Sequence, residues 1–174
     1  MQSKDKLENK FLDLIHTHQG MLYRISMLYE AEYIHRDDLL QEMLLQLWRS
    51  FPSFKHQATF ATWMYRVALN TALMHQRKQV RNPLSKPVIL KNIADDEQDS
   101  QSVTEEIDLL YQSIRELPRL DRAIILLKLE NNSYHEISEI TGISAKNVSA
   151  RLARNKPKLR KILLDKGYRE DIQQ

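Results

Sequence analysis

The sequence predicts an all-α protein with two small helical domains joined by a flexible linker. Apolar residues recur at helical spacing through most of the 174 residues, only three glycines occur, and runs of β-branched residues are few. Two Ser-x-x-Glu patterns, at Ser102 and Ser133, are typical of capping boxes at helix N-termini. We place the domains at residues 7–81 and 102–165, because residues 82–101 combine two prolines with acids, serine and glutamine, as linkers do.

Three helices are expected in the N-terminal domain, at about residues 7–30, 37–49 and 59–78. Apolar residues at helical spacing mark the first: Leu7, Phe11, Leu14, Ile15, Leu22, Ile25 and Tyr29. Phe51-Pro52 would end the second helix, and Thr59 would cap the third. The positions expected to be buried in the second and third helices are Leu40, Met43, Leu44, Leu47, Phe60, Met64, Val67 and Thr71.

The C-terminal domain is expected to open with a helix that Ser102 caps and Pro118 breaks. This helix has one apolar side, formed by Val103, Ile107, Leu110, Ile114 and Leu117. A second helix would supply the apolar centre of the domain with Ile124, Ile125, Leu126, Leu127 and Leu129.

Residues 133–155 indicate two short helices joined by a tight turn. Gly142 can adopt the left-handed conformation that ends the first helix, and Ser144 can cap the second. The second helix would bury Val148 and Leu152 and present the opposite face to solvent. That face carries Lys146, Asn147, Ala150, Arg151 and Arg154. This layout is typical of a helix-turn-helix that enters a DNA major groove, with an ordinary helical hairpin as the alternative.

Charge is segregated along the chain. Residues 43–94 contain eight Lys or Arg and no acid, and residues 140–164 contain seven and no acid. Between them, residues 92–114 contain no Lys or Arg and hold an acidic cluster. Two basic blocks around an acidic segment suggest two surfaces that bind polyanions, although chance segregation on solvated faces would give the same pattern.

The side chains on one face of the third expected helix indicate which kind of nucleic acid the protein binds. Trp63, Arg66, Asn70 and Arg77 fall within a narrow sector of its circumference. An aromatic ring that stacks on an unpaired base, flanked by cations that hold phosphates, is what single-stranded DNA requires. A stripe of this kind can also cover a packed surface.

The second helix carries a surface of mixed polarity beside its expected core. This surface consists of Asp38, Gln41, Glu42, Leu45 and Arg49. Acids at Asp37 and Asp38 can favour a helix dipole, but Leu45 among polar neighbours suits a protein partner better.

Other functional classes find little support. The chain contains no cysteine, has no apolar run long enough to cross a bilayer and begins with a segment too charged for a signal peptide, which suits the cytoplasm. His16 and His18 point to nearly opposite sides of a helix, and no glycine-rich phosphate loop occurs. We therefore expect no enzyme, no metal or other cofactor and no small-molecule substrate.

Taken together, these motifs resemble those of extracytoplasmic-function sigma factors, which belong to the sigma-70 family. The first domain of that family is resembled by Asp37-Asp38-Leu39-Leu40-Gln41-Glu42, by Leu47-Trp48, by residues 59–70 and by Arg77-Lys78. Its second domain is resembled by Leu117-Pro118, Asp121-Arg122 and the helix-turn-helix with Arg151-Leu152. The resemblance extends over about residues 7–164, in the order and spacing of the family.

The resemblance implies a function as an alternative sigma factor, with core RNA polymerase, promoter DNA and an anti-sigma factor as partners. Core polymerase would be bound by Asp38, Gln41, Glu42, Leu45 and Arg49. The minus-ten element would be recognised and held open by Phe54, Lys55, Trp63, Arg66, Asn70, Arg77 and Lys78. The minus-thirty-five element would be read by Lys146, Asn147, Ala150, Arg151 and Arg154.

Two positions depart from the family pattern. Met74 stands where many relatives carry an acid, and Pro157 stands where relatives usually continue the recognition helix with basic residues. Because proline cannot donate to the carbonyl of Ala153, the helix is expected to kink or end near Lys156. A stand-alone helix-turn-helix regulator is the alternative function, but it leaves the N-terminal basic block unexplained.

Overall fold

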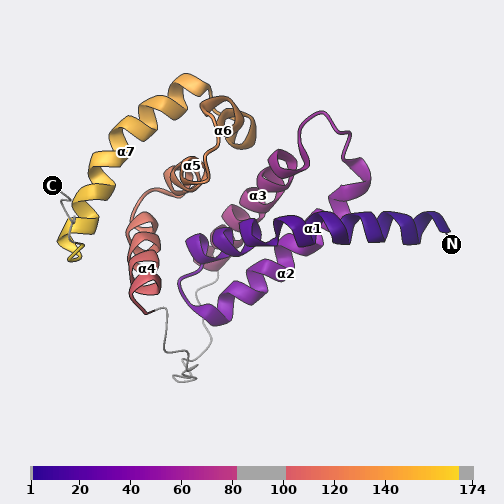
Figure 1. Ribbon diagram of the computed structural model, residues 1–174, viewed down its shortest axis with the longest axis horizontal. Coiled ribbons are helices and arrows are strands. Elements are labelled where there is room, and N and C mark those ends of the chain that lie inside the picture. The colour runs from indigo at the N-terminus through magenta and orange to yellow at the C-terminus, as the bar shows by residue number, and fades with distance from the viewer. Residues whose placement is uncertain (1, 82–100, 169–174) are drawn as a thin grey trace.

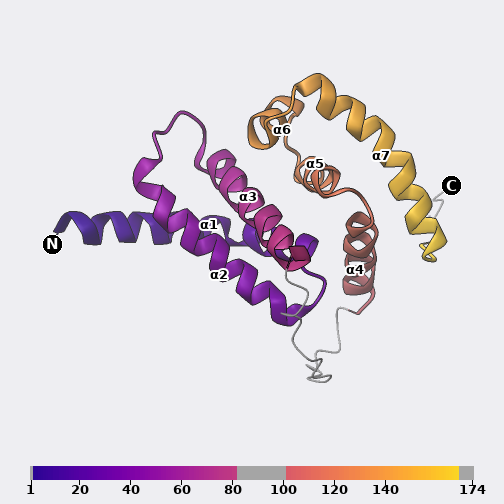
Figure 2. The same ribbon diagram turned by 180° about the vertical axis from the view of Figure 1, so that it is seen from behind.

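The computed structural model describes residues 2–81 and 101–168. Within these ranges the chain forms seven α-helices, one short 3-10 helix and no strand, which confirms the predicted all-α class. The predicted linker lies outside the described residues, apart from Gln101, at which α4 begins. The helices form two groups, α1 to α3 and α4 to α7, and both views place the second group along one side of the first, with α7 on the outside (Figures 1 and 2).

The first group is a three-helix bundle of α1 (Gln2–Tyr29), α2 (Tyr33–Ser50) and α3 (Phe60–Arg81). Each helix buries one stripe of its surface. In α2 the stripe is Leu39, Met43 and Leu47, one residue for each turn, and all three are fully buried. They pack with residues of α1 and α3 that are also inaccessible to solvent, including Leu22, Ile25 and Met64.

The start of α2 differs from the prediction. The helix begins at Tyr33, after Glu32 in an extended conformation, so Asp37 and Asp38 lie beyond its first turn and do not cap it. The guanidinium of Arg36 donates hydrogen bonds to the carbonyls of Glu30 and Ala31, which closes the connection from α1 to α2. The sequence pattern missed this start because the helix has no side-chain cap.

Two expected core residues are exposed. Leu44 follows Met43 by about 100° around α2, which carries it past the edge of the buried stripe, and it is 36% exposed. Leu129 is the last residue of α5 and is 53% exposed. Both predictions were wrong because apolar character alone does not fix the edge of a helical stripe.

The second group contains α4 (Gln101–Arg115), α5 (Arg119–Leu129), α6 (Tyr134–Thr141) and α7 (Ala145–Asp165). α5 is buried along five successive residues, from Ala123 to Leu127, because other helices cover more than one of its sides. α4 begins one residue before Ser102, so the capping box predicted there does not mark its first residue; the Ser102 side chain lies outside the described ones.

We expected α7 to kink or end near Lys156; it does not end there but continues through Pro157 to Asp165. The proline removes one backbone hydrogen bond, but beyond it Leu159 and Ile162 still pack against the core and α7 contacts α4. This packing holds the helix together across the missing bond. The helix follows a curved path in both ribbon views (Figures 1 and 2).

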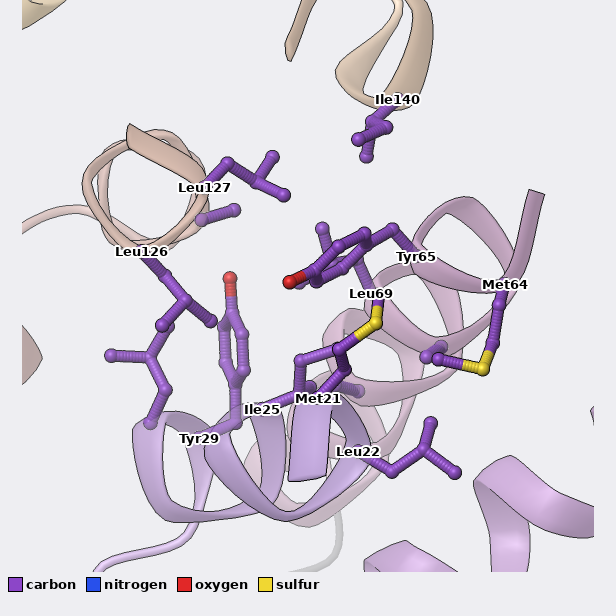
Figure 3. Close-up of a cluster of buried hydrophobic side chains, with 14 of the residues drawn as sticks. Met21, Leu22, Ile25, Tyr29, Met64, Tyr65, Leu69, Leu126, Leu127 and Ile140 are labelled. Atoms are coloured by element: carbon purple, nitrogen blue, oxygen red, sulfur yellow. The ribbon is translucent and has the colours of Figure 1, made fainter. Parts of the chain in front are cut away.

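The two groups share one continuous apolar core. Met21, Ile25 and Tyr29 of α1, Tyr65 and Leu69 of α3, Leu126 and Leu127 of α5 and Ile140 of α6 gather in a single cluster (Figure 3). All of these residues are buried. The helix-turn-helix group is therefore docked on the N-terminal bundle.

Candidate nucleic-acid interface

The connection between α2 and α3 forms the first candidate site. A 3-10 turn (Phe51–Ser53) follows α2 and buries Phe51. The hydroxyl of Thr59 accepts a hydrogen bond of 3.1 Å from the amide of Thr62, which caps α3 as predicted. The loop between the 3-10 turn and α3 is fixed at both ends, so its side chains have a defined position relative to α3.

Trp63 sits in an aromatic cluster at the start of α3. Its ring centroid lies 5.0 Å from that of Phe54, 5.4 Å from that of Phe60 and 6.2 Å from that of Phe51. Trp63 is half-buried, so part of the indole stays accessible. The cluster fixes the orientation of the indole, and Trp63 also lines a pocket.

A pocket of about 140 Å³ opens beside this cluster, several times the volume of one water molecule, ~30 Å³. Its wall includes Phe54, Lys55, Trp63 and Arg66, together with small and amide residues of the loop. Four of the predicted minus-ten residues are thus brought together around one cavity. An aromatic surface and two cations around a small pocket suit an unpaired base with its phosphates.

The remaining predicted minus-ten residues lie farther along α3. Asn70 and Arg77 are exposed on the same side as Arg66, with the exposed Met74 between them. From Trp63 to Arg77 the helix rises about 21 Å, so this side follows a strand over several nucleotides rather than adding to the pocket. Lys78 differs, because its ammonium forms an ion pair of 3.0 Å with Glu42 of α2.

Glu42 belongs to a hydrogen-bonded network between the helices of the bundle. His75 of α3 lies between two carboxylates, with Nδ1 2.7 Å from Glu42 Oε2 and Nε2 3.4 Å from Glu30 Oε1. The contact with Glu30 raises the pKa of His75; burial opposes the rise, and Glu42 adds to it. Burial would raise the pKa of Glu42, but hydrogen bonds from His75 and Lys78 hold it below its usual value.

The surface of α2 is the second candidate site. Asp38, Gln41, Leu45 and Arg49 are exposed along one side of the helix. Leu44 adds apolar surface next to Leu45, which is 46% exposed. Glu42 is the predicted member that the structure does not leave open to a partner, since His75 and Lys78 already engage its carboxylate.

The helix-turn-helix is the third candidate site. Ser133 and Glu136 form the predicted capping box: the Ser133 hydroxyl accepts from the Glu136 amide at 3.2 Å, and the Glu136 carboxylate accepts from the Ser133 amide at 2.7 Å. The hydrogen bond from the Ser133 amide to the carboxylate is the main cause that holds the pKa of Glu136 below its usual value. Gly142 takes a φ of 77° at the end of α6, and the hydroxyl of Ser144 accepts from the amide of Asn147 at the start of α7. The turn was therefore predicted correctly, residue by residue.

The first turns of α7 present most of the predicted reading residues to solvent. Lys146, Asn147, Ala150 and Arg154 are exposed, while Val148 and Leu152 are buried on the other side. Arg151 is half-buried, and its Nη1 donates to Oδ1 of Asp121 in α5 at 2.7 Å. Asp121 was named above only as part of the family motif, and its contact with Arg151 was not expected; an acid in the first turn of an apolar helix was the available signal.

A basic helix-turn-helix together with an aromatic and basic pocket is typical of a DNA-binding protein. Two family models match the chain: sigma-70 region 2 over residues 14–82 and sigma-70 region 4 over residues 107–159. The first match contains the pocket and the α2 surface, and the second contains the helix-turn-helix.

Curated relatives agree with these matches. The chain is 32% identical over 131 residues to the ECF RNA polymerase sigma-E factor of Escherichia coli K12, covering 67% of this chain and 68% of that protein. It is 29% identical over 139 residues to the sigma-E factor of Haemophilus influenzae, covering 71% of this chain and 74% of that protein. The chain belongs to the extracytoplasmic-function (ECF) sigma factors of the sigma-70 family, and it is an alternative sigma factor that directs transcription.

Solved structures share the fold. The sigma factor RpoE of Bartonella quintana, in complex with the anti-sigma factor NepR, matches with a TM-score of 0.72 at 19% identity, over 89% of this chain and 97% of that one. CnrH, in complex with the cytosolic domain of CnrY, matches with a TM-score of 0.67 at 21% identity, over 92% of this chain and 91% of that one. Among the described helices, none is both long and apolar enough to cross a membrane.

Proposed function

We propose that this sigma factor binds promoter DNA at two separate sites while the surface of its α2 helix binds core RNA polymerase. The observation that carries the proposal is the pocket between the α2–α3 loop and α3, where an aromatic cluster and two cations meet. Residues 7–81 act as the polymerase-binding and minus-ten domain, and residues 102–165 act as the minus-thirty-five domain. The protein works by binding in the cytoplasm and catalyses no reaction itself.

In the N-terminal domain, Trp63 and Phe54 stack against an unpaired base of the minus-ten element. Lys55 and Arg66 hold its phosphates, and Asn70 and Arg77 follow the strand along α3. Binding energy gained only with the separated strand makes opening of the duplex less unfavourable. Lys78 contributes mainly through its ion pair with Glu42.

In the C-terminal domain, Lys146, Asn147, Ala150 and Arg154 face the major groove of the minus-thirty-five element. Their exposure on the first turns of α7 supports this assignment. Arg151 is tied to Asp121, so we assign it to orienting α7 rather than to reading a base.

On α2, Asp38, Gln41, Leu45 and Arg49 contact core polymerase, with Leu44 as an added apolar contact. Glu42 does not contact the polymerase directly; it stabilises the position of α2 through its contacts with His75 and Lys78 of α3. An anti-sigma factor is a further partner of the chain. Of the two solved structures that share the fold, RpoE was solved in complex with the anti-sigma factor NepR, and CnrH was solved in complex with the cytosolic domain of CnrY.

Reconstituted transcription tests this function. Purified protein is mixed with core RNA polymerase and a genomic promoter library, and RNA start sites are mapped. We expect binding to core and initiation at a small set of promoters. Absence of core binding and of specific start sites would refute the proposal.

The alternative, a stand-alone helix-turn-helix regulator, predicts a different result. Such a protein would bind promoter duplex without core polymerase and would need none of the α2 surface. Exchanging the exposed Leu45 for Glu separates the two functions: initiation should fall sharply, while the duplex affinity of the free chain should fall only by the small amount that one added negative charge causes.

A further inference from the structure

Arg66 is shared between the candidate DNA pocket and the helix-turn-helix group. Arg66 lines the pocket together with Trp63, and its guanidinium donates two hydrogen bonds to the backbone carbonyl of Glu139. Nε donates at 3.2 Å and Nη2 at 2.7 Å. Glu139 lies in the last turn of α6, 73 positions away in the sequence.

The chemistry of this contact matches that of a phosphate contact. Nε and one terminal nitrogen form one edge of the guanidinium fork, the edge that grips carboxylates and phosphates bidentately. Carbonyl groups in the last turn of a helix have no partner within the helix and carry the negative end of its dipole. In the docked arrangement, the end of α6 therefore occupies the position in which Arg66 would hold a phosphate.

Other contacts hold the same arrangement. The hydroxyl of Tyr29 donates to the carbonyl of Arg119 at 2.9 Å, and the guanidinium of Arg115 donates to the carbonyl of Met27 at 3.0 Å. Arg24 of α1 forms an ion pair with Glu130, which follows α5. Together with the apolar cluster of Figure 3, these contacts make docking a specific state of the chain.

One feature limits the stability of this state. Tyr65 is 3% exposed in the middle of the shared cluster, and its hydroxyl finds no hydrogen-bond partner among the described residues. A buried hydroxyl without a partner lacks the hydrogen bonds that water would provide. Separation of the two groups of helices would return this hydroxyl to water. The docked state is therefore less stable than the apolar area buried between the groups alone would make it.

We propose that the helix-turn-helix group is an intramolecular competitor of unpaired DNA: docked, it takes the phosphate-binding edge of Arg66, and the two groups must separate before the pocket binds a strand. This inference rests on the proposed function of the pocket. In the free chain, the second domain inhibits binding of single-stranded DNA, because the end of α6 contacts Arg66 where the strand would.

Reversal of the Arg24–Glu130 pair tests the competition. Neither residue lies in a proposed DNA or polymerase surface, and Arg24→Glu places two acids together across the interface. The variant also makes the chain more acidic, which by itself weakens DNA binding. We expect Arg24→Glu to raise the affinity of the free chain for short, random-sequence single-stranded DNA roughly threefold to tenfold.

Three controls accompany this variant. The double variant Arg24→Glu, Glu130→Arg restores the pair and should return the affinity to that of the original chain. Lys10→Glu changes the same charge at an exposed position of α1 and should not raise the affinity. Tyr65→Phe removes the unpartnered hydroxyl and keeps the ring, so it should tighten docking and lower the affinity a few-fold.

Docking itself is measured independently of DNA. Because the chain contains no cysteine, spin labels can be attached at Glu8→Cys and Lys161→Cys, two exposed positions in different groups. We expect one narrow distance in the original chain and a longer, broader distribution in Arg24→Glu that the double variant reverses. Added single-stranded DNA should open the original chain.

The inference is overturned by an original chain that is already open, or by an opened Arg24→Glu chain whose affinity for single strands has not changed. It is also overturned if Arg24→Glu and Tyr65→Phe leave both distance and affinity unchanged. In each case, specific initiation by the holoenzyme would show that the proposed function itself still stands.

Discussion

The guanidinium of Arg151 donates to the carboxylate of Asp121 at 2.7 Å and ties the recognition helix α7 to α5. The Asp121 side chain is only 3% exposed, so it depends on this partner for compensation of its charge. Arg151 directly follows the exposed Ala150 in α7. Under the proposed function, the pair sets the angle at which the exposed residues of α7 meet a DNA groove.

The first prediction concerns the two partners of this pair. Arg151→Ala leaves a buried carboxylate without compensation and should lower the free energy of unfolding by about 1–3 kcal/mol. Asp121→Asn should cost less, because it removes the buried charge. If both residues act by orienting α7, affinity for minus-thirty-five duplex should fall by a similar factor in both variants. Loss of duplex binding in Arg151→Ala alone would indicate that Arg151 contacts bases directly.

The second prediction concerns the indole of Trp63. Stacking of one base on an aromatic side chain contributes about 1–3 kcal/mol. Trp63→Ala should therefore weaken binding of unpaired minus-ten strand by about tenfold and change duplex affinity little. Trp48→Ala is the matched control, because Trp48 packs on Phe11, with ring centroids 5.0 Å apart, and does not line the pocket. Equal losses for strand and duplex in a folded Trp63→Ala chain would count against stacking.

The third prediction is a dependence of stability on pH. The carboxylates of Glu30 and Glu42 raise the folded-state pKa of His75 above 6.5. Their stabilisation is complete below the unfolded-state pKa and is lost as pH rises from about 6.5 through the higher folded-state pKa. The loss has a slope of at most about 1.4 kcal/mol per pH unit. Urea unfolding across this range should show the decline, and His75→Gln should remove it; an unchanged profile in the variant would exclude His75 as its source.

The fourth prediction concerns Pro157 within α7. Pro157→Ala restores the donor to the Ala153 carbonyl and relieves the clash of the ring with the preceding turn, so it should stabilise the protein by about 1–3 kcal/mol. Duplex affinity should stay the same, because Pro157 follows the exposed reading residues. A large change in duplex affinity would show that the curvature of α7 positions those residues.

Local patterns in the sequence were sufficient for the turn of the helix-turn-helix. The capping box at Ser133, the left-handed Gly142 and the cap at Ser144 each depend on residues no more than three positions apart. The buried residues Val148 and Leu152 follow from helical spacing. The cap of α3 at Thr59 was predictable for the same reason.

Contacts between distant segments were not predictable in this way. Arg66 meets Glu139 and Arg151 meets Asp121 across 73 and 30 positions, and no periodicity indicates either pair. The start of α2 has no side-chain cap, and the persistence of α7 through Pro157 depends on packing against α4. Sequence reasoning thus located the surfaces, while the partners of their charged residues required the fold.

The measurement that tests the account most directly is permanganate footprinting of a promoter bound by the holoenzyme. We predict reactive, unpaired thymines around the minus-ten element with the original chain, and loss of this reactivity with Trp63→Ala while duplex contacts at the minus-thirty-five element persist. A minus-ten element that opens equally well with Trp63→Ala, or with Lys55 and Arg66 both replaced by Ala, would contradict the account.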